Sequence, residues 1–166
     1  VLGASYHPAG AEGPARRQLN VSIYDQAFGV SSEGTPDPLK TYQMQYFNLQ
    51  HQVFETLVML DVTTNTVLPL LAEKWEQTDP LTIRFYLRHD VRFHNDERFN
   101  AAVVSFTLDL MRNPRSRFAG RFLLDTIEAV TVVDDYTVDI RTRTYDSMLL
   151  RKLAAIGFMI PPGYYG

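Results

Sequence analysis

The sequence predicts a fold of the α+β class, and three observations carry this prediction. Residues 19–24 and 81–87 alternate apolar and polar side chains, as half-buried strands do. Residues 42–56 and 101–112 repeat apolar side chains every three or four positions, as amphipathic helices do. Strands and helices follow one another without a regular βαβ rhythm, which favours α+β over a doubly wound parallel sheet. Because 45% of the 166 residues are hydrophobic, the chain can form a core.

The first part of the chain is expected to hold one strand and one helix. Residues 1–18 contain three Gly and two Pro without an apolar period, which predicts a flexible lead-in. A strand begins at Leu19 and ends near Asp25. Residues 26–40 are rich in Gly, Ser and Pro and predict a long loop, and residues 42–56 then form the helix.

The next segment is typical of strands joined by turns. Residues 57–62 are strand-like, residues 63–66 have turn chemistry, and residues 67–71 form an apolar run that contains Pro69. Because Pro has no backbone N–H to donate, we place Pro69 at a sheet edge. A turn is predicted at residues 78–80, before the clearest strand of the chain at residues 81–87.

Asn100 is predicted to cap a helix over residues 101–112, because its side-chain oxygen can accept a hydrogen bond from the amides of the first turn. The buried stripe of this helix is predicted to be Val104, Leu108 and Met111. The helix ends at Asn113, because a residue before Pro is pushed out of the helical region. A β-hairpin (residues 127–133 and 136–141 around Asp134 and Asp135), a helix at 146–155 and a buried strand at 156–160 follow, closed by residues 161–163.

Composition and motifs exclude several classes of function. The formal net charge of -3 argues against nucleic acid as a partner. The absence of Cys excludes a disulfide scaffold, a thiolate zinc site and a cysteine nucleophile. No apolar run approaches the roughly 20 residues that span a bilayer. The sequence has no nucleophile elbow, dinucleotide motif or phosphate loop, so we expect a protein that is not an enzyme and needs no cofactor.

Two clusters of side chains suggest an ion site and are weighed against ordinary surface roles. His89, His94 and Asp96 are the densest group of metal-ligand types, but they flank a strand and a turn and do not share one helical face. Arg141 and Arg143 could hold an anion, although so short a basic spot is more often a solvated strand edge. We therefore predict no metal site.

Three segments in order carry a family resemblance. Residues 53–58 are VFETLV, residues 70–76 are LLAEKWE, and residues 85–95 are FYLRHDVRFHN. They resemble the N-terminal third of the peptide-type, family 5 extracellular solute-binding proteins of bacterial ABC importers. Residues 32–38 are similar to the family's loop after its first strand, and residues 160–164 to its returning segment. The resemblance thus covers residues 19–165.

The resemblance implies part of a two-lobed, periplasmic-binding-protein-like fold of class II type, with a mixed sheet and a small inserted subdomain. This chain would be the N-terminal part, with the second lobe absent. Residues 19–61 and 157–166 would belong to the first lobe, and residues 62–156 to the inserted subdomain. The chain departs from the family at Asp96, usually Gly, at Arg98, often Pro, and at residues 102–103, where an acidic pair is expected. These positions serve structure, so the departures concern hairpin and helix geometry rather than binding.

The loop at residues 29–40 is the predicted contact surface for a solute. Its Gly and Ser residues leave backbone amides and carbonyls accessible, so an extended peptide can pair with them as an added strand. The predicted ligand-binding residues are Ser31, Ser32, Glu33 and Gly34, and the alternative is an ordinary surface loop. Trp75 and Tyr86 could stack on a ligand, but a lone Trp after an apolar run is more often part of the core.

The function implied by the resemblance is the substrate-binding component of an ABC importer. It would capture a small solute, which we predict to be a di- or oligopeptide, and deliver it to the permease subunits. The location would be the periplasm or the extracellular face of the cytoplasmic membrane, with membrane contact only through the importer or a lipid anchor. The alternative is an interaction or regulatory domain that retains part of this fold without transport.

Overall fold

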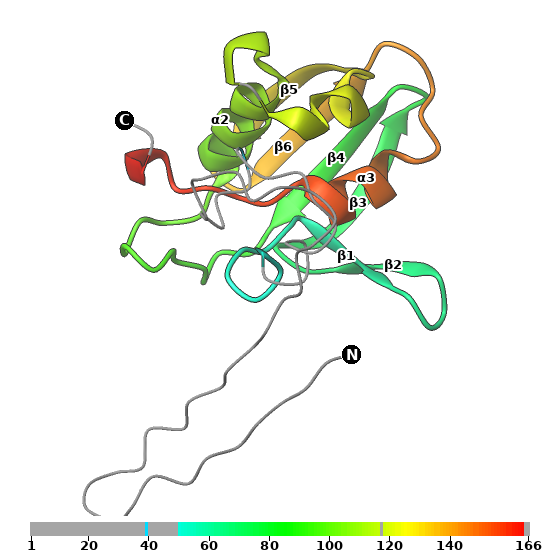
Figure 1. Cartoon of the computed structure of the whole chain (residues 1–166). Coiled ribbons are helices and arrows are strands. Elements are labelled where there is room, and N and C mark those ends of the chain that lie inside the picture. Colours follow the sequence, from blue (N-terminus) through cyan, green and yellow to red (C-terminus); the bar gives the residue numbers. More distant parts are fainter. Residues whose placement is uncertain (1–38, 40–49, 117, 165–166) are drawn as a thin grey trace, which may run out of the picture. The chain divides into compact units, whose positions relative to one another are not determined.

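The computed structural model describes residue 39, residues 50–116 and residues 118–164, all within one compact unit, Thr35–Gly166. The strand predicted at residues 19–25, most of the loop at 26–40 and most of the helix at 42–56 lie outside the described residues. Within the described residues the class is α+β, as predicted (Figure 1).

A four-stranded sheet forms the body of the described unit. Its order is β3 (Ala72–Asp79), β4 (Thr82–Leu87), β6 (Thr137–Thr142) and β5 (Ile127–Asp134), and each neighbouring pair is antiparallel. Phe85 in β4 lies opposite both Trp75 and Val138, so the register gathers large apolar side chains in the middle of the sheet. The parallel pairs that a mixed sheet requires are not among the strand pairs of the described residues.

A separate hairpin joins β1 (Val58–Asp61) to β2 (Thr66–Pro69). The Asp61 carboxylate closes the turn by accepting hydrogen bonds from the Thr63 amide at 2.8 Å and the Thr64 hydroxyl at 2.7 Å. Asn65 adopts a positive φ of 57°, a conformation that Asn tolerates well. Pro69 ends β2 in this two-stranded sheet, which agrees with its predicted edge position.

The helix α2 (Ala101–Arg112) begins and ends as the sequence predicts. Asn100 is extended, and its Oδ1 accepts a hydrogen bond from the Val103 amide at 3.1 Å. Val104, Leu108 and Met111 are fully buried, as predicted for the stripe of this helix, and Ala101 and Thr107 are fully buried as well. The helix ends at Asn113, whose ψ of 124° is the extended conformation expected before Pro.

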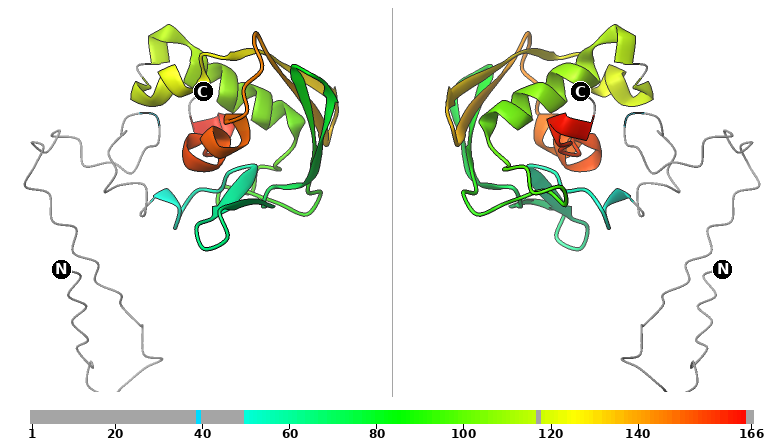
Figure 2. Two further views of the ribbon diagram at one scale, coloured as in Figure 1. Left: turned by 90° about the vertical axis from the view of Figure 1, so that its right-hand side faces the viewer. Right: turned by 90° about the vertical axis from the view of Figure 1, so that its left-hand side faces the viewer.

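The helix α3 (Leu149–Ile156) and three 3₁₀ turns complete the described unit: η1 (Pro114–Ser116), η2 (Ala119–Leu124) and η3 (Pro162–Tyr164). Figure 2 shows α2 and α3 on the same side of the four-stranded sheet. One cluster of buried apolar side chains fills the space between these helices and the sheet; it includes Phe85, Leu108, Ile140 and Leu153. No helix in the described part of the chain is long and apolar enough to span a bilayer.

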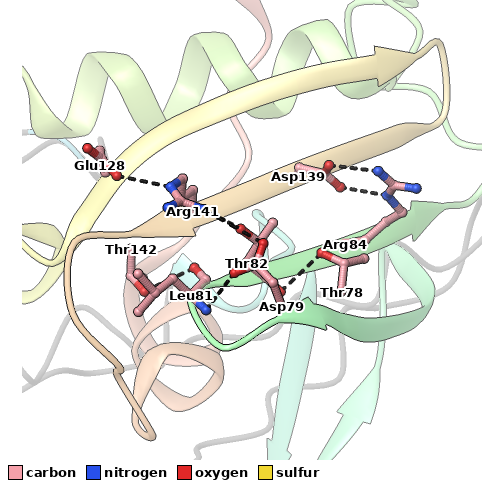
Figure 3. Close-up of polar contacts among 9 residues, drawn as sticks. All are labelled: Thr78, Asp79, Leu81, Thr82, Arg84, Glu128, Asp139, Arg141 and Thr142. Atoms are coloured by element: carbon pink, nitrogen blue, oxygen red, sulfur yellow. Dashed lines mark hydrogen bonds and ion pairs between the residues drawn. The ribbon is translucent and has the colours of Figure 1, made fainter.

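The other face of the sheet is polar (Figure 3). Arg84 binds Asp139 through two parallel hydrogen bonds of 2.7 and 2.8 Å, and this contact raises the pKa of Arg84. Arg141 lies near Glu128 at 3.2 Å and near Asp79 at 3.7 Å, so its guanidinium reaches from β6 to both edge strands. Positive and negative side chains alternate here, which is typical of a solvated sheet face.

Three elements differ from the prediction. The helix predicted to reach Thr56 does not do so, because Gln50 is helical but residues 51–53 form a turn. The apolar repeat pointed to a longer helix because it included Leu57, which is buried but lies in an extended segment. The edge strand β3 was missed, because its largely exposed and charged residues do not alternate with apolar ones.

The third difference concerns residues 156–160. They are buried as predicted, but Ile156 belongs to α3, and the remaining residues make only one isolated bridge, between Phe158 and Thr56. The backbone groups of successive residues here bind different elements, so no strand ladder forms. The turn predicted at residues 78–80 begins two residues later, at residues 80–81, and the turn predicted at residues 134–135 lies one residue later, at residues 135–136.

Candidate functional site

A groove of about 870 Å³ lies on the surface of the described residues. Three segments that are far apart in the sequence form it: residues 51–55, the hairpin at residues 91–99 (here the 91–99 hairpin), and residues 157–164 (here the return segment). Its lining is His51, Gln52, Val53, Phe54, Glu55, Leu71, Val91, Arg92, Phe93, His94, Asn95, Phe99, Met159, Ile160, Pro161 and Tyr164.

The return segment connects the other two walls. The Met159 amide donates to the Glu55 carbonyl at 2.8 Å, beside the bridge between Thr56 and Phe158. Further along, the Gly163 amide lies 3.2 Å from both carboxylate oxygens of Glu97 on the 91–99 hairpin. A Cβ atom on Gly163 would lie 2.5 Å from Glu97 Oε1, so this close approach requires glycine unless the Glu97 side chain moves.

The 91–99 hairpin holds its shape through local contacts. Arg92 and Arg98 form an antiparallel bridge, and the Phe93 amide donates to the Glu97 carbonyl at 2.9 Å. Asp96 at the tip has a φ of 67°, the left-handed conformation that favours glycine. Asp tolerates it better than most residues do, so the departure from the family's usual glycine changes the turn residue without removing the turn.

Aromatic rings line much of the groove, and polar groups lie along it. Phe93 packs edge-on against Phe99 with 6.3 Å between ring centroids, and His51 packs edge-on against Phe158 at 4.8 Å. Burial at this contact lowers the pKa of His51, which favours the neutral imidazole at pH 7. Such a combination of apolar walls with a few polar groups is typical of sites that bind small molecules.

A smaller depression of about 460 Å³ lies beside β4, between Pro69, Leu70, Glu73, Arg88, His89 and Asp90. Arg88 pairs with Asp90 there at 3.0 Å, and the Asp90 side chain is 71% exposed. Arg88 is paired with an exposed carboxylate of the same depression, so the depression is a weaker candidate than the groove.

The predicted ligand-binding residues Ser31, Ser32, Glu33 and Gly34 lie outside the described residues and stay predictions. Trp75 is partly buried and packs against the core, which confirms the structural role expected for it. Tyr86 donates to Glu76 at 2.6 Å, and Lys74 lies 4.3 Å from its ring centre. Tyr86 therefore binds neighbouring strand residues and does not line the groove.

The residues of the two possible ion clusters make other contacts in the structure. His89 stacks on Tyr136 with 3.9 Å between ring centroids, while His94 lines the groove. Within the described residues, no three His, Asp or Glu side chains come together as metal ligands. Arg141 pairs with carboxylates on the neighbouring strands, as a solvated strand residue does.

A family model covering "Bacterial extracellular solute-binding proteins, family 5 Middle" matches residues 66–165. The chain belongs to this family. The resemblance seen in the three sequence segments is thereby confirmed.

Two relatives and one solved structure illustrate the similarity. The chain is 31% identical to the dipeptide-binding protein of Escherichia coli over 155 residues, covering 80% of this chain and 29% of that protein. It is 30% identical to the HTH-type transcriptional regulator SgrR of Pectobacterium atrosepticum, covering 75% of this chain and 21% of that protein. It is 32% identical to NikA from Brucella suis, crystallised with Fe(III)-EDTA, with a TM-score of 0.70 over 78% of this chain and 26% of NikA.

The chain therefore spans less than a third of the length of these proteins. The solved structures it resembles are two-lobed periplasmic binding proteins, and the described residues share part of their fold. The fold class and the family that the sequence predicted are both confirmed.

Sequence reasoning did not find the groove. Its walls come from residues about 40 and 70 positions apart along the chain, and periodicity within one element carries no information about such contacts. The usable signal was the resemblance itself, because its three segments, residues 53–58, 70–76 and 85–95, and the returning residues 160–164 all contribute to the groove.

Proposed function

We propose that this chain is part of the substrate-binding component of an ABC importer, which captures a small solute outside the cytoplasmic membrane and delivers it to the permease. The observation that carries the proposal is the family match over residues 66–165. The similarity to NikA in both sequence and fold supports it.

The groove is proposed as one wall of the solute site. Its volume of about 870 Å³ suits a molecule of the size of a short peptide, because sites for small molecules occupy roughly 300–1,000 Å³. Independently of the groove, Ser31, Ser32, Glu33 and Gly34 are proposed from the sequence to contact the solute through their backbone groups. A second lobe closing over such a wall would remove the solute from water on both sides.

A di- or oligopeptide is the proposed solute. The dipeptide-binding relative supports this class, and the aromatic rings Phe54 and Phe93 in the groove suit the apolar side chains of a peptide. The relatives named for a solute are binding proteins, so we propose capture without a chemical reaction. The proposed location is the periplasm or the outer face of the cytoplasmic membrane, with the permease subunits as partners.

The alternative of a regulatory or interaction domain has one relative in its support, the transcriptional regulator SgrR. The other relatives and the solved structures are mainly peptide-, glutathione-, nickel- and opine-related binding proteins, and they favour transport. The experiment below tests solute capture, which the transport function requires.

A panel of solutes measured by thermal shift tests the proposal on the complete gene product that contains this chain. The panel comprises a pool of di- and tripeptides, a nickel–histidine complex and an oligosaccharide mixture. Ligand at about 100 times Kd stabilises the folded state by about 2.7 kcal/mol, which raises the Tm by several degrees. We expect the peptide pool to do this. A shift with another solute would correct the solute class, and no shift with any solute contradicts solute capture.

Two matched variants test the role of the groove. Val53 lines the groove and is 45% exposed, whereas Val132 on β5 is 44% exposed and lies outside the groove. Val53→Asp places a carboxylate in the apolar groove and is expected to weaken peptide affinity at least tenfold, while Val132→Asp leaves affinity unchanged. If the groove is instead filled by another part of the protein, Val53→Asp will lower the Tm and leave the Kd unchanged.

A further inference from the structure

Thr107 makes a contact that a threonine inside a helix does not normally make. Its side chain is fully buried in the middle of α2. A Thr inside a helix ordinarily points to solvent or binds the carbonyl one turn earlier in its own helix. Here, Thr107 Oγ1 lies 3.2 Å from the Ile160 amide and 3.3 Å from the Ile160 carbonyl oxygen, 53 residues further along the chain.

This one hydroxyl satisfies both backbone groups of a buried residue. A hydroxyl can accept from an amide and donate to a carbonyl at the same time. Ile160 is 1% exposed, so its polar groups would otherwise be buried without a strand partner. Thr107 therefore supplies the two bonds that a neighbouring strand would provide in a sheet.

Two other contacts hold the return segment on either side of Ile160. The Met159 amide binds the Glu55 carbonyl at 2.8 Å, and the Gly163 amide binds the Glu97 carboxylate at 3.2 Å. The segment is thus held at three points by three different parts of the chain. Met159, Ile160 and Pro161, which lie at or between these points, form one wall of the groove.

We propose that Thr107 is a positioning residue for solute binding. Its two hydrogen bonds to Ile160 fix this wall of the groove relative to α2. The inference rests on the proposed function of the groove. Preorganised walls raise affinity because less ordering is required when the solute binds. Loss of the two bonds therefore lowers affinity, even when the volume of the side chain is conserved.

Two substitutions separate positioning from simple packing. Thr107→Val keeps the shape and removes the hydroxyl, whereas Thr107→Ser keeps the hydroxyl and removes a methyl group. Amide hydrogen exchange of the complete gene product reports on the wall directly, with Ile140 in the central strand β6 as the reference amide. Titration with the pool of di- and tripeptides reports on the site.

We expect Thr107→Val to accelerate exchange of the Ile160 amide at least tenfold relative to Ile140 and to weaken peptide binding about tenfold. Thr107→Ser is expected to stay close to the wild type in both. If Thr107→Val fails to fold, Glu97→Ala replaces it as the test. The Glu97 side chain is half-buried and binds the Gly163 amide at the other end of the same wall, so its removal is also expected to weaken peptide binding.

The proposal is overturned if Ile160 exchange is unchanged in Thr107→Val, if Ile140 accelerates equally, or if Thr107→Ser behaves like Thr107→Val. It is also overturned if exchange changes while the peptide affinity of a binding-competent protein does not. If the wild-type protein binds no solute, the proposed function is wrong, and so is the role of Thr107 in solute binding. The exchange experiment then still reports whether Thr107 holds the backbone of Ile160.

Discussion

Asn100 stabilises the start of α2 through one hydrogen bond from the Val103 amide at 3.1 Å. The first turn of this helix has no acidic residue, so no carboxylate there complements the helix dipole. The first amides of a helix have no partner within the helix. The side-chain oxygen of Asn100 is therefore the main side-chain acceptor for them.

Replacing Asn100 with Ala is expected to destabilise the folded chain by about 1 kcal/mol, because the Val103 amide loses its side-chain acceptor and keeps only the Asn100 backbone carbonyl at 3.1 Å. Urea denaturation measures the difference, provided that the slope with denaturant is unchanged. Asn100→Asp retains an acceptor and serves as the control. Equal stability of Asn100→Ala and the wild type would show that the cap contributes nothing.

At the scale of elements, the predictable parts are those with a strong local signal. The helix α2 has a cap, a buried stripe and a Pro after its end, and the β5–β6 hairpin has two apolar strands around an acidic turn. The strand β3 lacks such a signal, because it lies at an edge and is held by its pairing with β4. The return segment owes its course to Thr107 and Glu97, which are distant in the sequence.

Asp146 links the turn before β5 to α3 through one carboxylate. It accepts hydrogen bonds from the Thr126 hydroxyl at 2.6 Å, from Lys152 of α3 at 2.7 Å and from the Met148 amide at 3.0 Å. The Asp146 side chain is only 7% exposed. Burial by itself would raise the pKa of Asp146, but the hydrogen bonds and the charge of Lys152 outweigh burial, and the pKa lies below its ordinary value.

A lowered pKa in the folded state means that this stabilisation is present above the unfolded pKa and is lost as the pH falls through the folded value. Asp146→Asn is therefore expected to cost about 2 kcal/mol at pH 7. The difference from the wild type should begin to shrink below about pH 4, where the carboxylate of the unfolded chain becomes protonated, and should continue to shrink until the folded carboxylate is protonated as well. Urea denaturation at several pH values gives both quantities.

Asp90→Asn is the matched control, because the Asp90 carboxylate is 71% exposed and pairs with Arg88 at the surface. Its effect on stability should be small at every pH. A cost for Asp146→Asn that stays constant between pH 7 and pH 3 would contradict the role assigned to the carboxylate.

At the scale of the whole molecule, the described residues form one compact unit with a groove built from distant segments. The expected boundary between residues 61 and 62 falls in the turn between β1 and β2, and the boundaries at 61/62 and 156/157 stay predictions. The predicted contact residues Ser31 to Gly34 also stay predictions. Composition could exclude classes of function, but only the family resemblance pointed to solute capture.

The central proposal is that this chain carries part of a solute site whose remaining contacts come from outside residues 1–166. The relatives that it matches support the proposal, because the chain spans less than a third of their length. Binding near 1 μM corresponds to about 8 kcal/mol, and the loss of roughly half of this free energy moves the Kd into the millimolar range. One open wall leaves a solute half solvated and is expected to bind it that weakly.

Parallel calorimetric titrations test this claim most directly. A pool of di- and tripeptides is titrated, at matched pH and salt, into residues 1–166 alone and into the complete gene product. We predict saturable heat with a micromolar Kd for the complete protein and no saturation below the millimolar range for residues 1–166. Micromolar saturation of residues 1–166 would mean that they hold a complete site, and the absence of saturation in both proteins would contradict peptide capture.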